Sequence, residues 1–198
     1  DAGVNTSALL TDMSTPLGRK IGNALEVEEA VEVLAGGGPA DVIELTVELV
    51  REMLRLAGKD ADDIESALKD GRAMDKWNQM IRAQGGDPSA VLPASNETHQ
   101  VLAETSGVVT QLDALSLGVA SWRLGAGRER KEDAVQFGAG ITLHAQLGES
   151  IKKGQVLMTL HTDEPARFER ALDSLKDGIT IEEATAVPKQ IILDRVTE

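Results

Sequence analysis

The sequence predicts a protein of the α/β class, with helices and strands segregated along the 198 residues (α+β). Between residues 23 and 86, apolar side chains recur at helical spacing between capping residues and glycines. From residue 105 onward, short apolar runs alternate with turns that contain glycine, which is typical of strands. Residues 88–96 contain two prolines and two serines and are predicted to be a linker. We therefore expect two domains, residues 1–92 and residues 98–198.

The composition limits the classes of function. Net charge is −13 and the isoelectric point is about 4.7, so the surface repels nucleic acid phosphates. The absence of cysteine excludes disulfides and thiolate zinc sites, and it fits a reducing compartment. No apolar run approaches the roughly 20 residues of a membrane span. We expect a cytoplasmic protein without a nucleic acid partner, a membrane partner or an organic cofactor.

The N-terminal half begins with a predicted buried strand at residues 4–13, and we expect its neighbouring strands to lie outside this sequence. A helix follows, capped by Asn23 with Glu26 three residues later, and a second cap of the same type is predicted at Asp41. Gly58 is expected to end the second helix. Two further helices are predicted around residues 60–68 and 74–81.

The C-terminal half is predicted to be mainly β. The expected strands are residues 108–112, 117–123, 134–144, 155–161 and 189–196. One helix interrupts them, with Asp163 as its cap and Pro165 in its first turn. The three histidines, His99, His144 and His161, have no neighbouring acid or second histidine at ligand spacing, so we interpret them as strand or packing residues.

Four segments resemble the pyrimidine-nucleoside phosphorylase family, which includes thymidine phosphorylase. The segments are TDMSTPLGRKIGNALEVEEA at 11–30, LGAGRERKED at 124–133, GAGI at 138–141 and GESIKKG at 148–154. The resemblance covers nearly the whole chain but only the C-terminal half of the family's sequence. It implies the end of the phosphorylase α/β domain followed by a β-rich C-terminal subdomain.

The resemblance implies a pentosyltransferase that carries out reversible phosphorolysis of pyrimidine nucleosides to free base and (deoxy)ribose 1-phosphate. Phosphate is the co-substrate, and family members are homodimers. The family's phosphate-binding segment Lys-His-Ser-Thr-Gly-Gly and the Arg, Ser and Lys of its base pocket do not occur in this sequence. We therefore assign no catalytic residue, and we expect the chain alone to be inactive.

The resemblance also implies a monovalent cation, typically potassium, in the loop and helix at residues 16–29. Its ligands would be the carbonyl oxygens of Leu17 and Lys20 and the side chain of Glu29. Oxygen donors suit a hard cation. On the residues alone, the favoured interpretation is that the carboxylates Glu26, Glu28 and Glu29 face solvent and stabilise the helix N-terminus.

The second implied feature is a mobile active-site loop that contains Gly125, Gly127 and Arg128. The alternative is a solvated connection between two strands. Residues 104–109 and 148–157 are also similar to the half-barrel strands of biotinyl and lipoyl carrier domains, but the lysine that such carriers modify has no counterpart at the required turn. Two other functions stay open, a non-catalytic binding or structural module and a related phosphoribosyltransferase.

Overall fold

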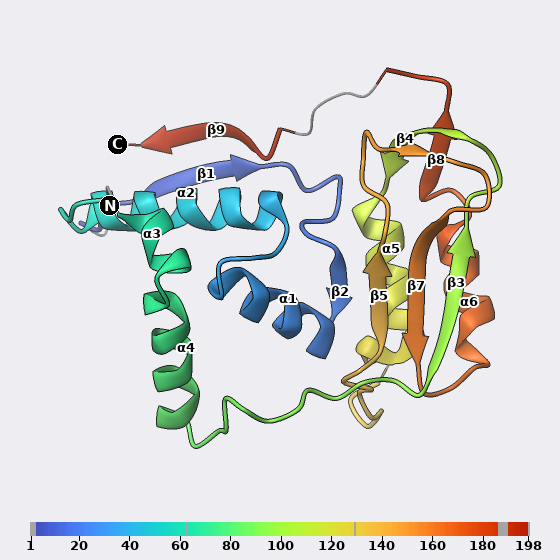
Figure 1. Ribbon diagram of the computed structural model, residues 1–198, viewed down its shortest axis with the longest axis horizontal. Helices are drawn as coiled ribbons and strands as arrows, with labels where there is room; N and C mark the ends of the chain where they lie inside the picture. Colours follow the sequence, from blue (N-terminus) through green and yellow to red (C-terminus); the bar gives the residue numbers. More distant parts are fainter. Residues whose placement is uncertain (1–2, 62, 129, 186–189, 198) are drawn as a thin grey trace. The chain divides into compact units, whose positions relative to one another are not determined.

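The computed structural model describes residues 3–61, 63–128, 130–185 and 190–197, and it confirms the mixed α and β class (Figure 1). The chain forms two compact units. Unit 1 consists of residues 1–12, 30–90 and 190–198, and unit 2 consists of residues 13–29 and 91–189. The expected domains, 1–92 and 98–198, stay a prediction. Within the described ranges, no helix is both long and apolar enough to cross a membrane.

Unit 1 contains a two-stranded antiparallel sheet made from the two ends of the chain. Strand β1 (Ser7–Thr11) pairs with β9 (Ile192–Thr197), with Leu9 opposite Arg195. The prediction that the first strand lacks a partner within this sequence was therefore wrong, because its partner lies at the opposite end of the sequence. The strand is also half-exposed rather than buried, and the Leu10 side chain is 46% accessible.

The remaining elements of unit 1 are helical, as their apolar periodicity predicts. They are α2 (Ala40–Leu56), α3 (Ile64–Lys69) and α4 (Arg72–Ala83). The cap expected at Asp41 was wrong, because α2 begins one residue earlier and Asp41 accepts the Val42 N–H at 3.0 Å. Gly58 follows this helix with φ of 63°, a left-handed conformation that suits glycine.

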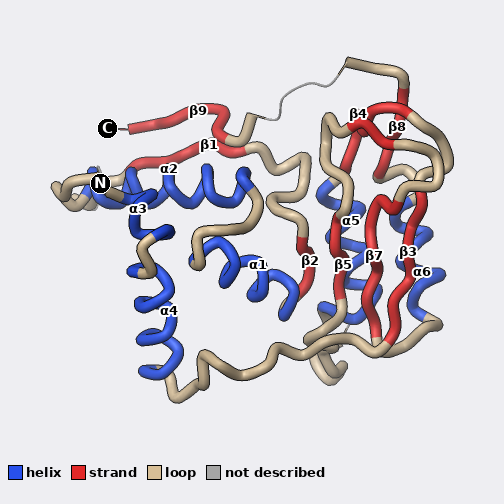
Figure 2. The backbone as a smooth tube through the Cα atoms, in the orientation of Figure 1, coloured by secondary structure: helices blue, strands red, loops and turns tan. Residues whose placement is uncertain are grey.

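Unit 2 contains two antiparallel sheets (Figure 2). The four-stranded sheet has the order β2 (Lys20–Gly22), β5 (Gly140–Leu143), β7 (Val156–Thr162) and β3 (Glu97–Leu102). The three-stranded sheet has the order β6 (Ser150–Ile151), β4 (Gly107–Leu112) and β8 (Ile179–Glu182). The division between the two units falls within helix α1 (Ala24–Leu34).

Helices α5 (Ala114–Ser121) and α6 (Arg167–Leu175) pack on one face of the four-stranded sheet (Figure 1). The strand residues that face these helices are fully or almost fully buried: Ile141, Leu143, Met158 and Leu160. Alternate residues of the same strands point to the opposite face, which is polar and includes Thr142, Thr159 and His161. The apolar core of unit 2 therefore lies between the sheet and the two helices.

The strand expected at residues 117–123 is a helix. Helix α5 begins at Ala114, and the π-helical turn η1 (Trp122–Ala126) continues it. Asp113 caps the helix, because its Oδ2 accepts the Ser116 N–H at 2.7 Å. The prediction failed because α5 is apolar around most of its circumference, so it has no single apolar stripe to indicate a helix.

Two other boundaries also differ from the prediction. Of the expected strand at 134–144, only Gly140–Leu143 is extended and paired. Helix α6 follows Ala166 and is not capped by Asp163. The carboxylate of Asp163 instead accepts two hydrogen bonds from Asn96, one from its backbone N–H and one from its side-chain amide, both at 2.9 Å.

Candidate functional site

The predicted cation loop places the Glu29 carboxylate against the loop backbone. Glu29 is 7% accessible, and its Oε1 accepts the Arg19 N–H at 2.9 Å. Gly18, in the same loop, has φ of 72°, which permits the turn that precedes β2. The alternative interpretation, in which Glu26, Glu28 and Glu29 face solvent, is therefore wrong for Glu29.

The two neighbouring carboxylates have different partners. Glu26 Oε1 accepts the Gly22 N–H at 2.9 Å, so it closes the first turn of α1. Glu28 Oε2 forms an ion pair with Lys20 Nζ at 2.6 Å. The Lys20 ammonium is therefore engaged by Glu28, while its strand pairs with β5 through Thr142. Within the described ranges, no group of three or more His, Cys, Asp or Glu side chains could hold a metal.

The segment with Gly125, Gly127 and Arg128 continues from helix α5 rather than from a strand. Gly125 lies inside η1, is buried and has φ of 114°. Its carbonyl oxygen accepts the Gln136 N–H at 3.0 Å. Trp122 Nε1 donates to the Arg128 carbonyl oxygen at 3.0 Å. The interpretation of this segment as a solvated turn between two strands is therefore wrong, although Arg128 itself is exposed.

Gln136 connects the glycine-rich segment, residues 125–127, to the turn that precedes α6. Its Oε1 accepts the Asp163 N–H at 2.8 Å and lies 3.0 Å from the Thr162 hydroxyl, and its Nε2 donates to Glu164 Oε1 at 2.7 Å. Thr162 is fully buried, and its Oγ1 lies 2.7 Å from the Leu124 carbonyl oxygen. The network fixes η1 and the approach to α6 relative to each other. No pattern of spacing in the sequence indicates it.

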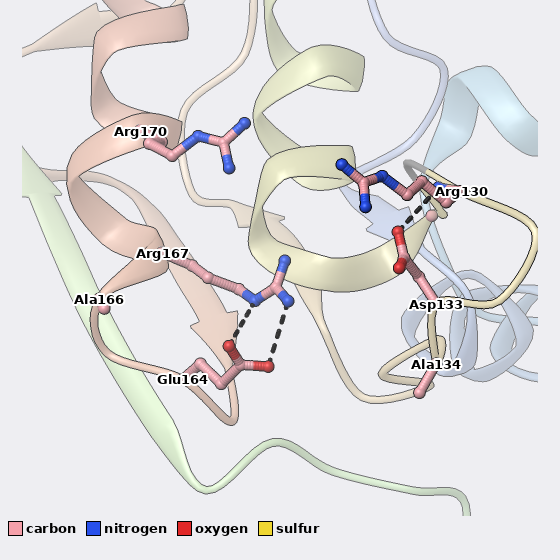
Figure 3. A pocket seen from close by; sticks show the side chains of 8 residues that line it. Arg130, Asp133, Ala134, Glu164, Ala166, Arg167 and Arg170 are labelled. Carbon is pink, nitrogen blue, oxygen red and sulfur yellow. Dashed lines mark hydrogen bonds and ion pairs between the residues drawn. The ribbon is translucent and has the colours of Figure 1, made fainter.

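A pocket of about 390 Å³ lies beside this network (Figure 3). Its lining residues are Gly127, Arg130, Asp133, Ala134, Glu164, Ala166, Arg167 and Arg170. Figure 3 shows the side chains of Arg130, Arg167 and Arg170 directed toward the space between them. The sequence analysis did not identify this cluster. The two arginines three residues apart on one helix are the signal that could have indicated it.

The histidines lie on or beside the four-stranded sheet, as predicted. His99 is in β3 and His161 is in β7. His161 Nε2 lies 3.0 Å from Thr142 Oγ1, and His144 Nε2 lies 2.8 Å from Thr159 Oγ1. Burial, together with the nearby His144 and Lys20, lowers the pKa of His161.

Comparison with known proteins supports the resemblance seen in the sequence. Residues 108–182 match the family model described as the pyrimidine nucleoside phosphorylase C-terminal domain. The chain is 48% identical over 194 residues to a thymidine phosphorylase of Mycobacterium tuberculosis, and the aligned region covers 98% of this chain and 45% of that protein. It is 39% identical over 202 residues to a pyrimidine-nucleoside phosphorylase of Staphylococcus epidermidis, which covers 96% of this chain and 46% of that protein. The chain thus spans less than half the length of the curated relatives it matches.

Proposed function

We propose that this chain, a relative of the pyrimidine-nucleoside phosphorylases, forms part of an enzyme that splits pyrimidine nucleosides with phosphate. The products would be the free base and (deoxy)ribose 1-phosphate. The observation that carries the proposal is 48% identity to a thymidine phosphorylase over 98% of the chain. The C-terminal domain match at residues 108–182 favours this enzyme over a phosphoribosyltransferase, because phosphoribosyltransferases lack that extension.

The substrates and assembly follow as parts of the same proposal. A pyrimidine nucleoside and phosphate are the substrates, the enzyme is a cytoplasmic homodimer, and catalysis uses residues outside this stretch of 198. For the similarity to biotinyl and lipoyl carrier domains, we propose a shared arrangement of strands and no carrier function. The similarity concerns residues 104–109 and 148–157, which contribute to β4, β6 and β7.

We further propose that the loop before α1 holds a monovalent cation, typically potassium. The carbonyl oxygens of Leu17 and Lys20 and the carboxylate of Glu29 would be its ligands from this chain. The residues suit such a cation because Glu29 is buried and already bonded to the loop backbone. The Lys20 ammonium is paired with Glu28, so its positive charge is partly offset. The cation would fix the loop and neutralise the buried carboxylate.

The proposed function is tested in a chimera. The chain replaces the residues of the Mycobacterium tuberculosis thymidine phosphorylase with which it aligns. We expect the purified chimera to release thymine from thymidine in the presence of phosphate, and the isolated 198-residue chain to release none. A chimera that folds and dimerises but releases no base from thymidine or uridine would favour the alternative, a non-catalytic module with the same architecture.

A further inference from the structure

We propose that the pocket between the glycine-rich segment and the start of α6 binds a phosphate group, either as inorganic phosphate or as a small phosphate monoester. This pocket, which we call the arginine pocket, is the space of about 390 Å³ shown in Figure 3. It shares Gly127 with the segment that the resemblance implies is a mobile active-site loop, but it contains no part of the family's phosphate-binding segment, which does not occur in this sequence. The inference does not depend on the proposed function.

Three guanidinium groups reach the arginine pocket from two sides. Arg130 comes from the segment after η1, and Arg167 and Arg170 come from the first turns of α6. The lining carboxylates are those of Asp133 and Glu164, so the lining side chains carry a net charge of +1. The chain as a whole carries −13. A local excess of positive charge on so acidic a protein focuses anions at this place.

Of the two lining carboxylates, Glu164 bonds a guanidinium of the pocket and Asp133 bonds a backbone N–H. Glu164 pairs with Arg167, with Oε2 3.1 Å from Nε, and its Oε1 is held by Gln136. Asp133 Oδ2 accepts the backbone N–H of Arg130 at 2.7 Å. Among the residues that the structure describes, the guanidinium of Arg130 has no ion pair. Its donors are therefore available to a ligand.

The lining determines the chemical class of the ligand. A guanidinium presents several N–H donors in a plane, which match the oxygens of a phosphate group. The N-terminal end of α6, at Ala166 and Arg167, adds a favourable dipole for an anion. The apolar part of the lining is limited to Gly127, Ala134 and Ala166, so no aromatic or large aliphatic surface is available for a nucleobase. The volume accommodates phosphate or a small sugar phosphate.

The experiment is a titration of the 198-residue chain with inorganic phosphate at constant ionic strength and pH. Amide resonances are followed by NMR, and ribose 5-phosphate and chloride are titrated in parallel. We expect saturable shifts centred on residues 127–134 and 164–170 with phosphate, and no saturable shift there with chloride. If the sugar phosphate binds more tightly than phosphate, the occupant is an ester; if it binds less tightly, the occupant is the free ion. Both results support the phosphate class.

Three variants distinguish a specific phosphate-binding site from non-specific electrostatic attraction of phosphate to the protein. Arg130→Gln should weaken phosphate binding about 10-fold or more, the usual effect of losing a hydrogen bond between charged groups. Glu164→Gln should tighten binding, because it removes a negative charge from the lining. Arg82→Gln makes the same charge change on an exposed arginine of α4 in unit 1 and should leave binding unchanged.

Two outcomes would overturn the proposal. One is a response that rises linearly with phosphate and is matched by chloride. The other is equal weakening by Arg130→Gln and Arg82→Gln, which would show attraction to net charge alone. Because Arg130 is exposed and has no described ion pair, loss of folding is not the expected effect of its replacement, and a thermal melt of each variant checks this directly.

Discussion

Replacing Thr162 by valine removes a single hydroxyl from the interior of unit 2 while leaving the side-chain volume almost unchanged. Thr162 is fully buried, and its Oγ1 lies 2.7 Å from the Leu124 carbonyl oxygen and 3.0 Å from Gln136 Oε1. Its single proton serves one of these acceptors at a time. The hydroxyl oxygen also accepts the Glu164 N–H at 3.2 Å. The substitution therefore removes a shared junction between η1, Gln136 and the turn before α6.

The expected loss of stability follows from the polar groups that lose a hydrogen-bond partner. A buried polar group left unsatisfied costs about 1–3 kcal/mol, and no cavity is added because valine fills the same space. A loss of this size lowers the melting temperature of a protein of this length by about 2–12 °C. The free energy of unfolding is measured by urea titration, with Trp122 fluorescence as the signal in a background that carries Trp77→Phe.

Two matched variants make the result interpretable. Thr162→Ser keeps the hydroxyl and should retain most of the hydrogen-bonding contribution. Thr159→Val removes a hydroxyl that bonds His144 on the polar face of the same strand, and it should cost less because solvent can replace the partner. The expected role of the hydroxyl would be refuted if Thr162→Val had the same free energy of unfolding as the parent and Thr162→Ser had a lower one. That result would show that the methyl group of Thr162 matters and its hydroxyl does not.

Three further predictions follow from the structure. Gly140→Ala should destabilise unit 2 by about 1–3 kcal/mol, because φ is 152° and the new Cβ would lie 2.1 Å from the Ile21 carbonyl oxygen; an unchanged melting temperature in calorimetry would contradict this. In the chimera, Glu29→Gln should weaken the stabilisation that potassium gives at constant ionic strength. Glu32→Gln, an exposed carboxylate on the same helix, should follow the parent curve, and identical curves for all three proteins would exclude the cation site. Hydrogen bonding with the Arg55 side chain holds the pKa of Glu52 below its usual range. The ionised carboxylate therefore stabilises unit 1 at pH values above the ordinary carboxyl pKa. This stabilisation is lost as the pH falls through the lowered pKa of Glu52 in the folded protein. The stability difference between parent and Glu52→Gln should therefore shrink on acidification in urea titrations from pH 7 to pH 3, and a constant difference would refute the assignment.

The helices of unit 1 could be predicted from the sequence because their signals are local. Apolar spacing and the following glycines identified α2 and α4 to within a few residues. The partner of β1 could not be predicted, because β9 lies at the other end of the chain and pairing over that separation leaves no local pattern. A strand at residues 117–123 was predicted where α5 stands, although Asp113 with Ser116 is the kind of cap that could have indicated the helix.

In the candidate site, too, local features could be predicted from the sequence and long-range contacts could not. The resemblance, not the spacing of residues, singled out Glu29, and its role as a cation ligand stays a prediction. Its burial against the loop backbone depends on how α1 returns past the loop. The hydrogen bonds of Gln136 and the convergence of Arg130 with Arg167 depend on tertiary structure alone. Sequence spacing shows only that Arg167 and Arg170 share a helix face.

Simultaneous measurement of free base and pentose 1-phosphate in the chimera tests the central claim most directly. Thymidine and uridine are each incubated with phosphate, and both products are quantified against time. We predict equal amounts of base and pentose 1-phosphate, formed only when phosphate is present and only when this chain is joined to the N-terminal part of the relative. Base released without pentose 1-phosphate would indicate hydrolysis, and no release of base by a folded, dimeric chimera would contradict the assignment of this chain to a pyrimidine-nucleoside phosphorylase.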